Sequence, residues 1–193
     1  MSPVQRAMLT TGWPLMPGHA IVVRPLLPDD ADLVIALGRA LSSESLYQRF
    51  LTGGIKQNPQ LLSRLVNVDF TRDFALIATA TFAGEETPIG VARYARDESA
   101  AETAEIAITV ADAWHGNGTG KRLLRRLVAH AQASGLAGLT GDVLATNVAM
   151  LALARSVGFR VTFHPDEGHL RLISLALRDH HPGPIESHEE NEL

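Results

Sequence analysis

A glycine-rich turn between a β-branched strand and an amphipathic helix constrains the fold of this chain more than any other feature. Residues 108–120 have the sequence ITVADAWHGNGTG, and residues 121–133 continue as a helix with one apolar face. The first amides of a helix have no partners within it, and the helix dipole adds positive charge there. Glycines remove the Cβ atoms that would keep a ligand away from these amides. The segment therefore predicts a site for an anion such as a pyrophosphate.

Two common phosphate-binding turns do not fit this segment. A Walker loop has four residues between its first glycine and a Gly-Lys pair that Ser or Thr follows. Here three residues separate Gly116 from Gly120, and Arg122 follows Lys121. A dinucleotide-binding turn has the pattern G-x-G-x-x-G near the first strand of a βαβ unit, whereas this pattern is G-x-G-x-G and comes late in the chain. Neither class of nucleotide site is therefore expected.

The rest of the chain combines short strands with helices and has no linker that would divide it. Strands are expected at residues 20–24, 74–82, 89–95, 105–110, 139–144, 159–163 and 169–177. Helices are expected at residues 28–41, 43–50, 58–66, 121–133 and 147–157. This order predicts an α/β fold class, with a mixed α+β sheet and flanking helices.

The two ends of the chain differ in composition from the part between them. Pro14 and Pro17 interrupt the N-terminus, so residues 1–18 are expected to be a flexible leader. Residues 19–178 are expected to form the folded domain. Residues 179–193 are acidic and poor in apolar side chains, and we expect a disordered tail there.

Composition narrows the classes of function. The formal net charge is −4, so no overall positive field would attract phosphate backbones, and no nucleic-acid partner is expected. The chain has no Cys, and its His, Asp and Glu residues lack convincing metal-ligand spacing, so we expect no metal. No segment approaches the about 18 to 20 apolar residues of a membrane helix, and no clear signal peptide opens the chain. A cytoplasmic protein without a membrane partner is therefore expected.

Several motifs together resemble the GNAT superfamily of N-acetyltransferases. Residues 115–120 (HGNGTG) resemble its Q/R-x-x-G-x-G/A signature, residues 147–150 (NVAM) its N-x-x-A/M helix, and residues 156–159 (SVGF) its closing G-F pair. Residues 24–50 and the strand AEIAITV at 104–110 resemble the bacterial Pat-type protein lysine acetyltransferases. The resemblance covers roughly residues 20–178. His115 stands where Gln or Arg is usual, a change that a cradle built mostly of backbone should tolerate.

The resemblance implies a central, mixed and twisted sheet of about seven strands. Two neighbouring parallel strands, residues 105–110 and 139–144, would splay apart and hold the cosubstrate acetyl-CoA in the gap. Its pantetheine would pair with the backbone of the first strand, its pyrophosphate would rest on the turn, and the following helix would add a contact. The implied cofactor-binding residues are Ile108, Val110, His115, Gly116, Asn117, Gly118, Thr119, Gly120, Lys121 and Asn147.

The same resemblance implies the chemistry. Glu105 matches the glutamate proposed as general base in Pat-type enzymes, and Ala154 stands where many family members carry a tyrosine acid. The expected activity is transfer of acetyl from acetyl-CoA to an amine, with a protein lysine side chain as acceptor. A small-molecule amine, or a catalytically silent acyl-CoA-binding regulatory module, remain alternatives. The protein is expected to act as a monomer or homodimer.

The residues alone leave simpler interpretations open. Without the resemblance, Glu105 is an ordinary strand carboxylate facing solvent, and Asn147 is a helix N-cap. The helix at residues 121–133 predicts that His130 lies on its outer surface with Arg122, Arg125 and Arg126.

Overall fold

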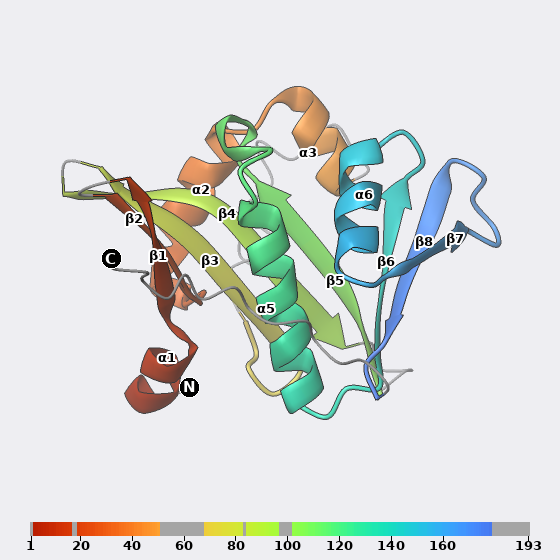
Figure 1. The fold of residues 1–193 in the computed structure, drawn as a ribbon, viewed down its shortest axis with the longest axis horizontal. Helices are drawn as coiled ribbons and strands as arrows, with labels where there is room; N and C mark the ends of the chain where they lie inside the picture. The colour runs from red at the N-terminus through yellow and green to blue at the C-terminus, as the bar shows by residue number, and fades with distance from the viewer. Residues whose placement is uncertain (1, 17–18, 51–67, 83, 97–101, 179–193) are drawn as a thin grey trace, which may run out of the picture.

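An eight-stranded mixed sheet forms the centre of the computed structural model, which describes residues 2–16, 19–50, 68–82, 84–96 and 102–178 (Figure 1). The strands are β1 (Thr11–Met16), β2 (His19–Pro25), β3 (Asp73–Phe82), β4 (Glu85–Arg96), β5 (Thr103–Val110), β6 (Gly138–Leu144), β7 (Arg160–Phe163) and β8 (Leu170–Ala176). Their spatial order is β1-β2-β3-β4-β5-β6-β8-β7. β5 and β6 run parallel, and the other neighbours are antiparallel.

The helices cover both faces of this sheet. They are α1 (Pro3–Leu9), α2 (Ala31–Arg39), α3 (Ser43–Phe50), α5 (Thr119–Ala133) and α6 (Val148–Ser156), with short 3₁₀ turns η1 (Pro28–Asp30) and η3 (Asp112–Trp114). These elements confirm the predicted mixed α/β fold. The predicted helix at residues 58–66 and the predicted tail at 179–193 lie outside the described residues.

β3 is an apolar strand because both of its faces are buried. Phe74, Leu76 and Ala78 belong to the larger core, which also contains the buried residues of α5. Ala75 and Ile77 belong to a second cluster on the opposite face, together with Val34 of α2. Figure 1 shows α5 lying across one face of the sheet, with α6 beside it near β6. The continuous run FALIATATF therefore comes from alternation between two covered faces.

Within residues 1–18, which were expected to be a flexible leader, the described residues form a helix and a strand. Ser2 and Gln5 form a capping box that starts α1, with the Ser2 amide donating to Gln5 Oε1 at 2.9 Å. β1 then pairs with β2 from Thr11 to Met16 as an edge strand, where a proline such as Pro14 is tolerated. With β1 included, the sheet has eight strands, whereas about seven were expected.

Two of the arginines expected on the surface of α5 contact this N-terminal segment. The guanidinium of Arg122 lies 4.6 Å from the ring centroid of Trp13, a cation–π contact. Arg126 approaches the carbonyl oxygen of Leu9 at 3.5 Å, and burial lowers the pKa of its guanidinium. The N-terminal segment is therefore packed against the helix that opens the glycine-rich turn.

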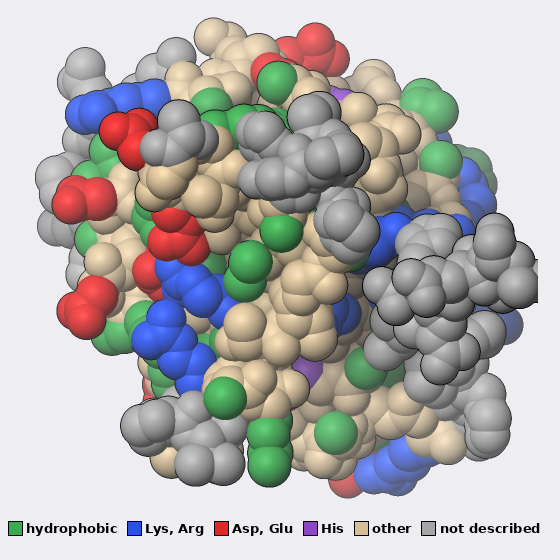
Figure 2. All heavy atoms as spheres, turned by 60° about the vertical axis from the view of Figure 1, so that its left-hand side comes forward, with side chains coloured by type: hydrophobic (Ala, Val, Ile, Leu, Met, Phe, Trp, Pro, Cys, Tyr) green, Lys and Arg blue, Asp and Glu red, His purple; other side chains and the backbone are tan. Residues whose placement is uncertain are grey.

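Charges of both signs share the side of the molecule where β1 and β2 lie. Figure 2 shows Lys and Arg next to Asp and Glu side chains there, with hydrophobic side chains scattered among them. The described part of this face therefore has no extended surface of one charge.

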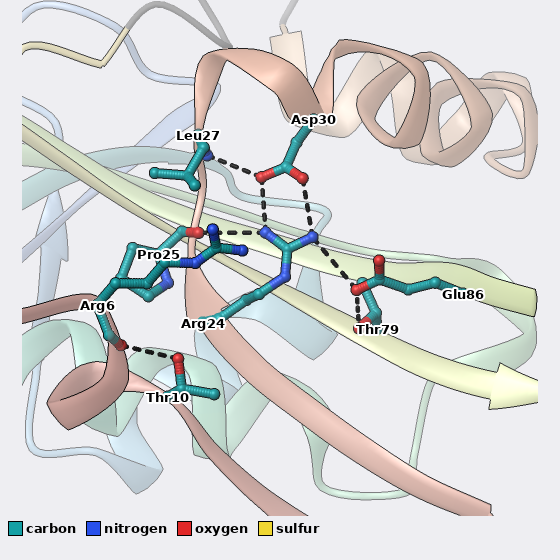
Figure 3. A network of polar contacts seen from close by, with 8 residues as sticks. All are labelled: Arg6, Thr10, Arg24, Pro25, Leu27, Asp30, Thr79 and Glu86. Atoms are coloured by element: carbon teal, nitrogen blue, oxygen red, sulfur yellow. Dashed lines mark hydrogen bonds and ion pairs between the residues drawn. The ribbon is translucent and has the colours of Figure 1, made fainter. Parts of the chain in front are cut away.

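A buried ion pair fixes the start of α2 to the sheet (Figure 3). The guanidinium of Arg24 donates to both carboxylate oxygens of Asp30, at 2.7 and 2.8 Å, and to Glu86 at 3.2 Å. Burial alone would raise the pKa of Asp30, but the hydrogen bonds from Arg24 and the Leu27 amide outweigh it and lower that pKa. Thr79 donates to the same Glu86 oxygen at 2.8 Å, so four elements share one network.

His130 packs into the sheet, unlike the outer position predicted for it. Its ring stacks on Phe74 with centroids 3.4 Å apart and planes inclined by 4°. The Tyr94 hydroxyl lies 3.1 Å from its Nδ1. Burial lowers the pKa of His130 to about 4. The stacking contact orients α5. Because burial lowers the pKa of His130 to about 4, the folded protein keeps this histidine neutral at neutral pH.

This lowered pKa predicts a loss of stability in mild acid. The unfolded chain takes up a proton as pH falls through about 6.5, whereas folded His130 stays neutral until about 4, so stability falls across that window. Between pH 7.5 and 4.5 we expect wild type to lose about 2 kcal/mol more unfolding free energy than His130→Gln. Urea denaturation at both pH values measures this. Equal losses in the two proteins would show that His130 does not set the acid sensitivity.

Candidate active site

β5 and β6 separate shortly after they begin to pair. Their register contains three pairs, Thr103 with Gly138, Ala104 with Leu139 and Glu105 with Thr140. Beyond Glu105, β5 continues to Val110 with no further β6 partner among the described residues. A cleft of about 710 Å³ occupies the gap, with walls from α3, β5, the 115–121 turn, β6 and α6. The splayed pair expected from the sequence is thus present at the expected strands.

The edge of β5 presents backbone groups to this cleft. The Ala111 amide donates to Ile89 on β4 at 2.9 Å, so the backbone groups of Ala111 face β4. Since backbone groups alternate sides along a strand, those of Val110 and Ile108 face the cleft. Both residues line it. The two positions predicted for backbone pairing therefore have the required orientation.

The glycine-rich turn forms one end of the cleft. Gly116 and Gly118 have φ angles of 77° and 84°, a left-handed conformation that favours glycine, and Gly118 is the N-cap of α5. A Cβ on Gly120 would lie 3.2 Å from Leu153 of α6, so this glycine lets the two helices approach. All three glycines and Lys121 line the cleft. The turn thus presents the positive end of a helix to the cavity.

Asn117 and Thr119 were predicted to bind cofactor, but they are not among the residues that line the cleft. Asn117 Oδ1 accepts from the Thr119 amide at 3.1 Å and from its hydroxyl at 2.7 Å. Thr119 is buried beneath the turn. The Asn117 side chain therefore holds the shape of the turn, and the cofactor contact expected of the backbone at these two residues stays a prediction.

His115 lies on the cleft wall and contacts β5. Its Nε2 is 2.9 Å from the Val110 carbonyl oxygen. Because a carbonyl can only accept, Nε2 carries the hydrogen. The same nitrogen is 3.9 Å from Asp112 Oδ1. His115 therefore braces the turn against the end of β5, and one lone pair of the Val110 carbonyl is engaged.

Asp112 joins α3 to the rim of the cleft. Its carboxylate accepts from the Ser45 hydroxyl at 2.6 Å and from the Ser42 amide at 2.8 Å. Burial acts to raise the pKa of Asp112, but these hydrogen bonds outweigh it and lower that pKa. Asp112 was not predicted to have a role, although its place two residues after the end of β5 is a signal that could have identified it.

Glu105 is the last β5 residue paired with β6, and its side chain is exposed in the cleft. Arg49 of α3 lines the same cavity and is close enough to interact electrostatically. Burial lowers the pKa of Arg49 to about 10, as does the charge of Arg93, while the Glu105 carboxylate opposes the shift. A cation that stays protonated at neutral pH therefore lies near the predicted base. No local pattern in the sequence singles out Arg49.

Asn147 acts as the N-cap of α6 and lines the cleft as well. Its Oδ1 accepts from the Met150 amide at 3.0 Å. Further along the helix, Ala154 is buried at the position of the family's tyrosine. Tyr47 and Tyr94 are not among the cleft-lining residues. Within the described residues, no tyrosine hydroxyl therefore reaches this cavity wall.

The described residues lack the features of two other kinds of site. They contain no group of three or more His, Cys, Asp or Glu side chains placed to hold a metal ion. None of their helices combines the length and apolarity needed to cross a membrane.

Comparisons with known proteins agree with this geometry. Residues 20–160 match the family model of the acetyltransferase (GNAT) domain. The chain is 31% identical over 161 residues to an acetyltransferase of Pseudomonas aeruginosa, covering 83% of this chain and 86% of that protein. It is 33% identical over 141 residues to acetyltransferase Pat of Mycolicibacterium smegmatis, covering 73% of this chain and 41% of Pat.

A solved structure resembles the whole domain. The crystal structure of the GNAT domain of S. lividans PAT aligns with a TM-score of 0.78 and 26% identity, covering 89% of this chain and 98% of that one. The family match spans most of the described domain, including the splayed strands and the glycine-rich turn. The chain therefore belongs to the GNAT acetyltransferase family and is an acetyl-CoA-dependent N-acetyltransferase.

Proposed function

We propose that this enzyme acetylates a lysine side chain of another protein, with acetyl-CoA in the cleft between β5 and β6 and Glu105 as general base. The observation that carries the proposal is the position of Glu105. Its carboxylate lies in the cleft where β5 and β6 begin to separate. A base at that point can reach both an amine entering from the α3 side and a thioester held along β5.

The residues present fit acetyl-CoA. Ile108 and Val110 direct backbone groups into the cleft, and Gly116, Gly118 and Gly120 leave the start of α5 open to an anion. His115, Lys121 and Asn147 complete the set that would hold the cosubstrate. Bound there, acetyl-CoA supplies the acetyl thioester that the amine attacks.

The acceptor amine must lose a proton before it can react, and Glu105 is the proposed acceptor of that proton. A lysine amine has an ordinary pKa of about 10.4, so roughly one in a thousand is neutral at pH 7.4. Only the neutral amine can attack a thioester. Glu105 takes the proton from the amine, directly or through a water, as the new C–N bond forms. With Ala154 at the tyrosine position, the thiolate leaves without a tyrosine acid.

The choice of a protein lysine rests on similarity to Pat-type enzymes. The identity to Pat of M. smegmatis and the fold of the S. lividans PAT domain both support it. Residues 24–50, which resemble the opening of those enzymes, include α3, and α3 contributes Ser45, Gln48 and Arg49 to the cleft. The chain spans 41% of the M. smegmatis protein, so nothing of that protein's regulation is carried over.

Mass spectrometry of a bacterial lysate tests the acceptor. After incubation with acetyl-CoA and enzyme, we expect acetyl-lysine at specific protein sites, and those sites should lose most of their signal with Glu105→Gln. A sample with acetyl-CoA alone corrects for spontaneous acetylation. If acetyl transfer occurs only to polyamines, amino acids or other small amines, the small-molecule alternative replaces the proposal.

A further inference from the structure

A second carboxylate, Asp142 on β6, lines the cleft on the same face of the sheet as Glu105. Glu105 pairs with Thr140 in parallel register, so these two side chains point to one face. Asp142 is two residues further along β6 and shares the face of Thr140 by strand alternation. Its side chain is 39% exposed. Among the described residues that line the cleft, Glu105 and Asp142 are the two carboxylates.

The β7–β8 turn holds a histidine against Asp142. His164 Nε2 is 3.6 Å from Asp142 Oδ1, and the His164 side chain is 17% exposed. Its other nitrogen, Nδ1, accepts from the amides of Asp166 at 3.2 Å and Glu167 at 2.9 Å. An Nδ1 that accepts two hydrogen bonds carries no hydrogen, so the ring hydrogen is on Nε2, the nitrogen that lies 3.6 Å from Asp142.

The charges along the cleft wall make Asp142 different from Glu105. Arg49 lies near Glu105 and offsets part of its charge, and Lys121 belongs to the turn at the start of α5. Asp142 lies beside His164, and its side chain is 39% exposed. At neutral pH an amine acceptor arrives almost entirely as ammonium. A partly exposed carboxylate fixed on the wall of the cleft is suited to receive that cation.

We propose that Asp142 binds the ammonium form of the acceptor before Glu105 removes its proton, and that His164 is a positioning residue for Asp142. The inference rests on the proposed function, since it assumes an amine acceptor. The two carboxylates then have different roles. Asp142 governs how tightly the acceptor binds, and Glu105 governs the chemical step.

Asp142→Asn separates these roles. For a capped Gly-Lys-Gly peptide we expect KM to rise about tenfold, kcat to change less than about threefold, and acetyl-CoA affinity to stay unchanged. Calorimetric titration of the same peptide into the enzyme–coenzyme A complex should show the same loss of affinity without any turnover. Asp166→Asn is the matched control, because it removes the same charge from the β7–β8 turn that carries His164 but lies outside the cleft-lining residues. It should leave KM and affinity as in wild type.

A double-mutant cycle tests His164. His164→Ala should raise KM in the wild-type background and have little further effect in Asp142→Asn, because both act through one carboxylate. An equal effect in both backgrounds would overturn the positioning role. Unchanged peptide affinity in Asp142→Asn, or no measurable binding to the wild-type complex, would overturn the role of Asp142. Failure of acetyl transfer in the presence of normal peptide binding would instead overturn the proposed function.

Discussion

Gly118→Asp is expected to raise the dissociation constant for acetyl-CoA by about a hundredfold or more, while the protein still folds. Gly118 is the N-cap of α5, has a φ of 84° and lines the cleft. An aspartate is a favourable N-cap and tolerates left-handed φ better than most residues, so the cost in stability should be about 1 kcal/mol. Its carboxylate, however, would occupy the helix amides that a pyrophosphate needs and would repel its charge.

Thermal unfolding with increasing acetyl-CoA measures the effect. A ligand that binds only the folded state raises the free energy of unfolding by mass action, by about 2.7 kcal/mol at a hundred times its dissociation constant, and the melting temperature rises with it. Wild type should show this rise, and Gly118→Asp should not. Gly118→Asn is the matched control, with the same size and backbone demand but no charge, and should retain part of the affinity. If NAD or ATP stabilises the wild-type protein and acetyl-CoA does not, the cosubstrate assignment fails.

The parts of this site that could be predicted from the sequence are those encoded by neighbouring residues. The turn from 115 to 120 and the apolar face of α5 are adjacent in the chain, so spacing alone predicts a helix N-terminus open to an anion. The family resemblance, now confirmed, added the splayed strands and the positions of Ile108 and Val110 along the cleft. Asn117 shows the limit of this reasoning. Its side chain bonds back to Thr119, a local contact that the motif does not specify, and the cofactor contact expected of its backbone stays a prediction.

The parts that escaped prediction depend on contacts between distant segments. Asp112 binds Ser42 and Ser45, about 70 residues earlier, and this contact sets α3 beside the cleft. Arg49 reaches the neighbourhood of Glu105 across a similar separation. The N-terminal strand β1 was not predicted because Pro14 interrupts its sequence pattern. In the fold, pairing with β2 outweighs that local signal. His130 likewise has a helical spacing that fits the surface, yet it stacks on Phe74 of β3.

Glu105→Gln is expected to lower kcat by about 10²- to 10³-fold at pH 7 and to leave the affinity for acetyl-CoA nearly unchanged. Gln keeps the size of the side chain at the start of the splay, so the cleft should keep its shape. What is lost is the group that accepts the proton from the amine. The neutral fraction of a lysine amine grows about tenfold per pH unit below its pKa, so the variant should recover activity steeply between pH 7 and 9. Wild type, which deprotonates the bound amine itself, should gain less over that range.

Steady-state kinetics from pH 6.5 to 9.5, with one lysine peptide as acceptor, measures this difference. Glu102→Gln is the matched control, because Glu102 directly precedes β5, is exposed and pairs with Arg178 at 3.1 Å away from the cleft-lining residues. It should match wild type at every pH. A parallel pH profile for wild type and Glu105→Gln would mean that the amine loses its proton elsewhere, even if the rate is reduced. Full activity of Glu105→Gln at neutral pH would remove Glu105 from the mechanism, whereas the family assignment rests on the turn and the splayed strands and would stand.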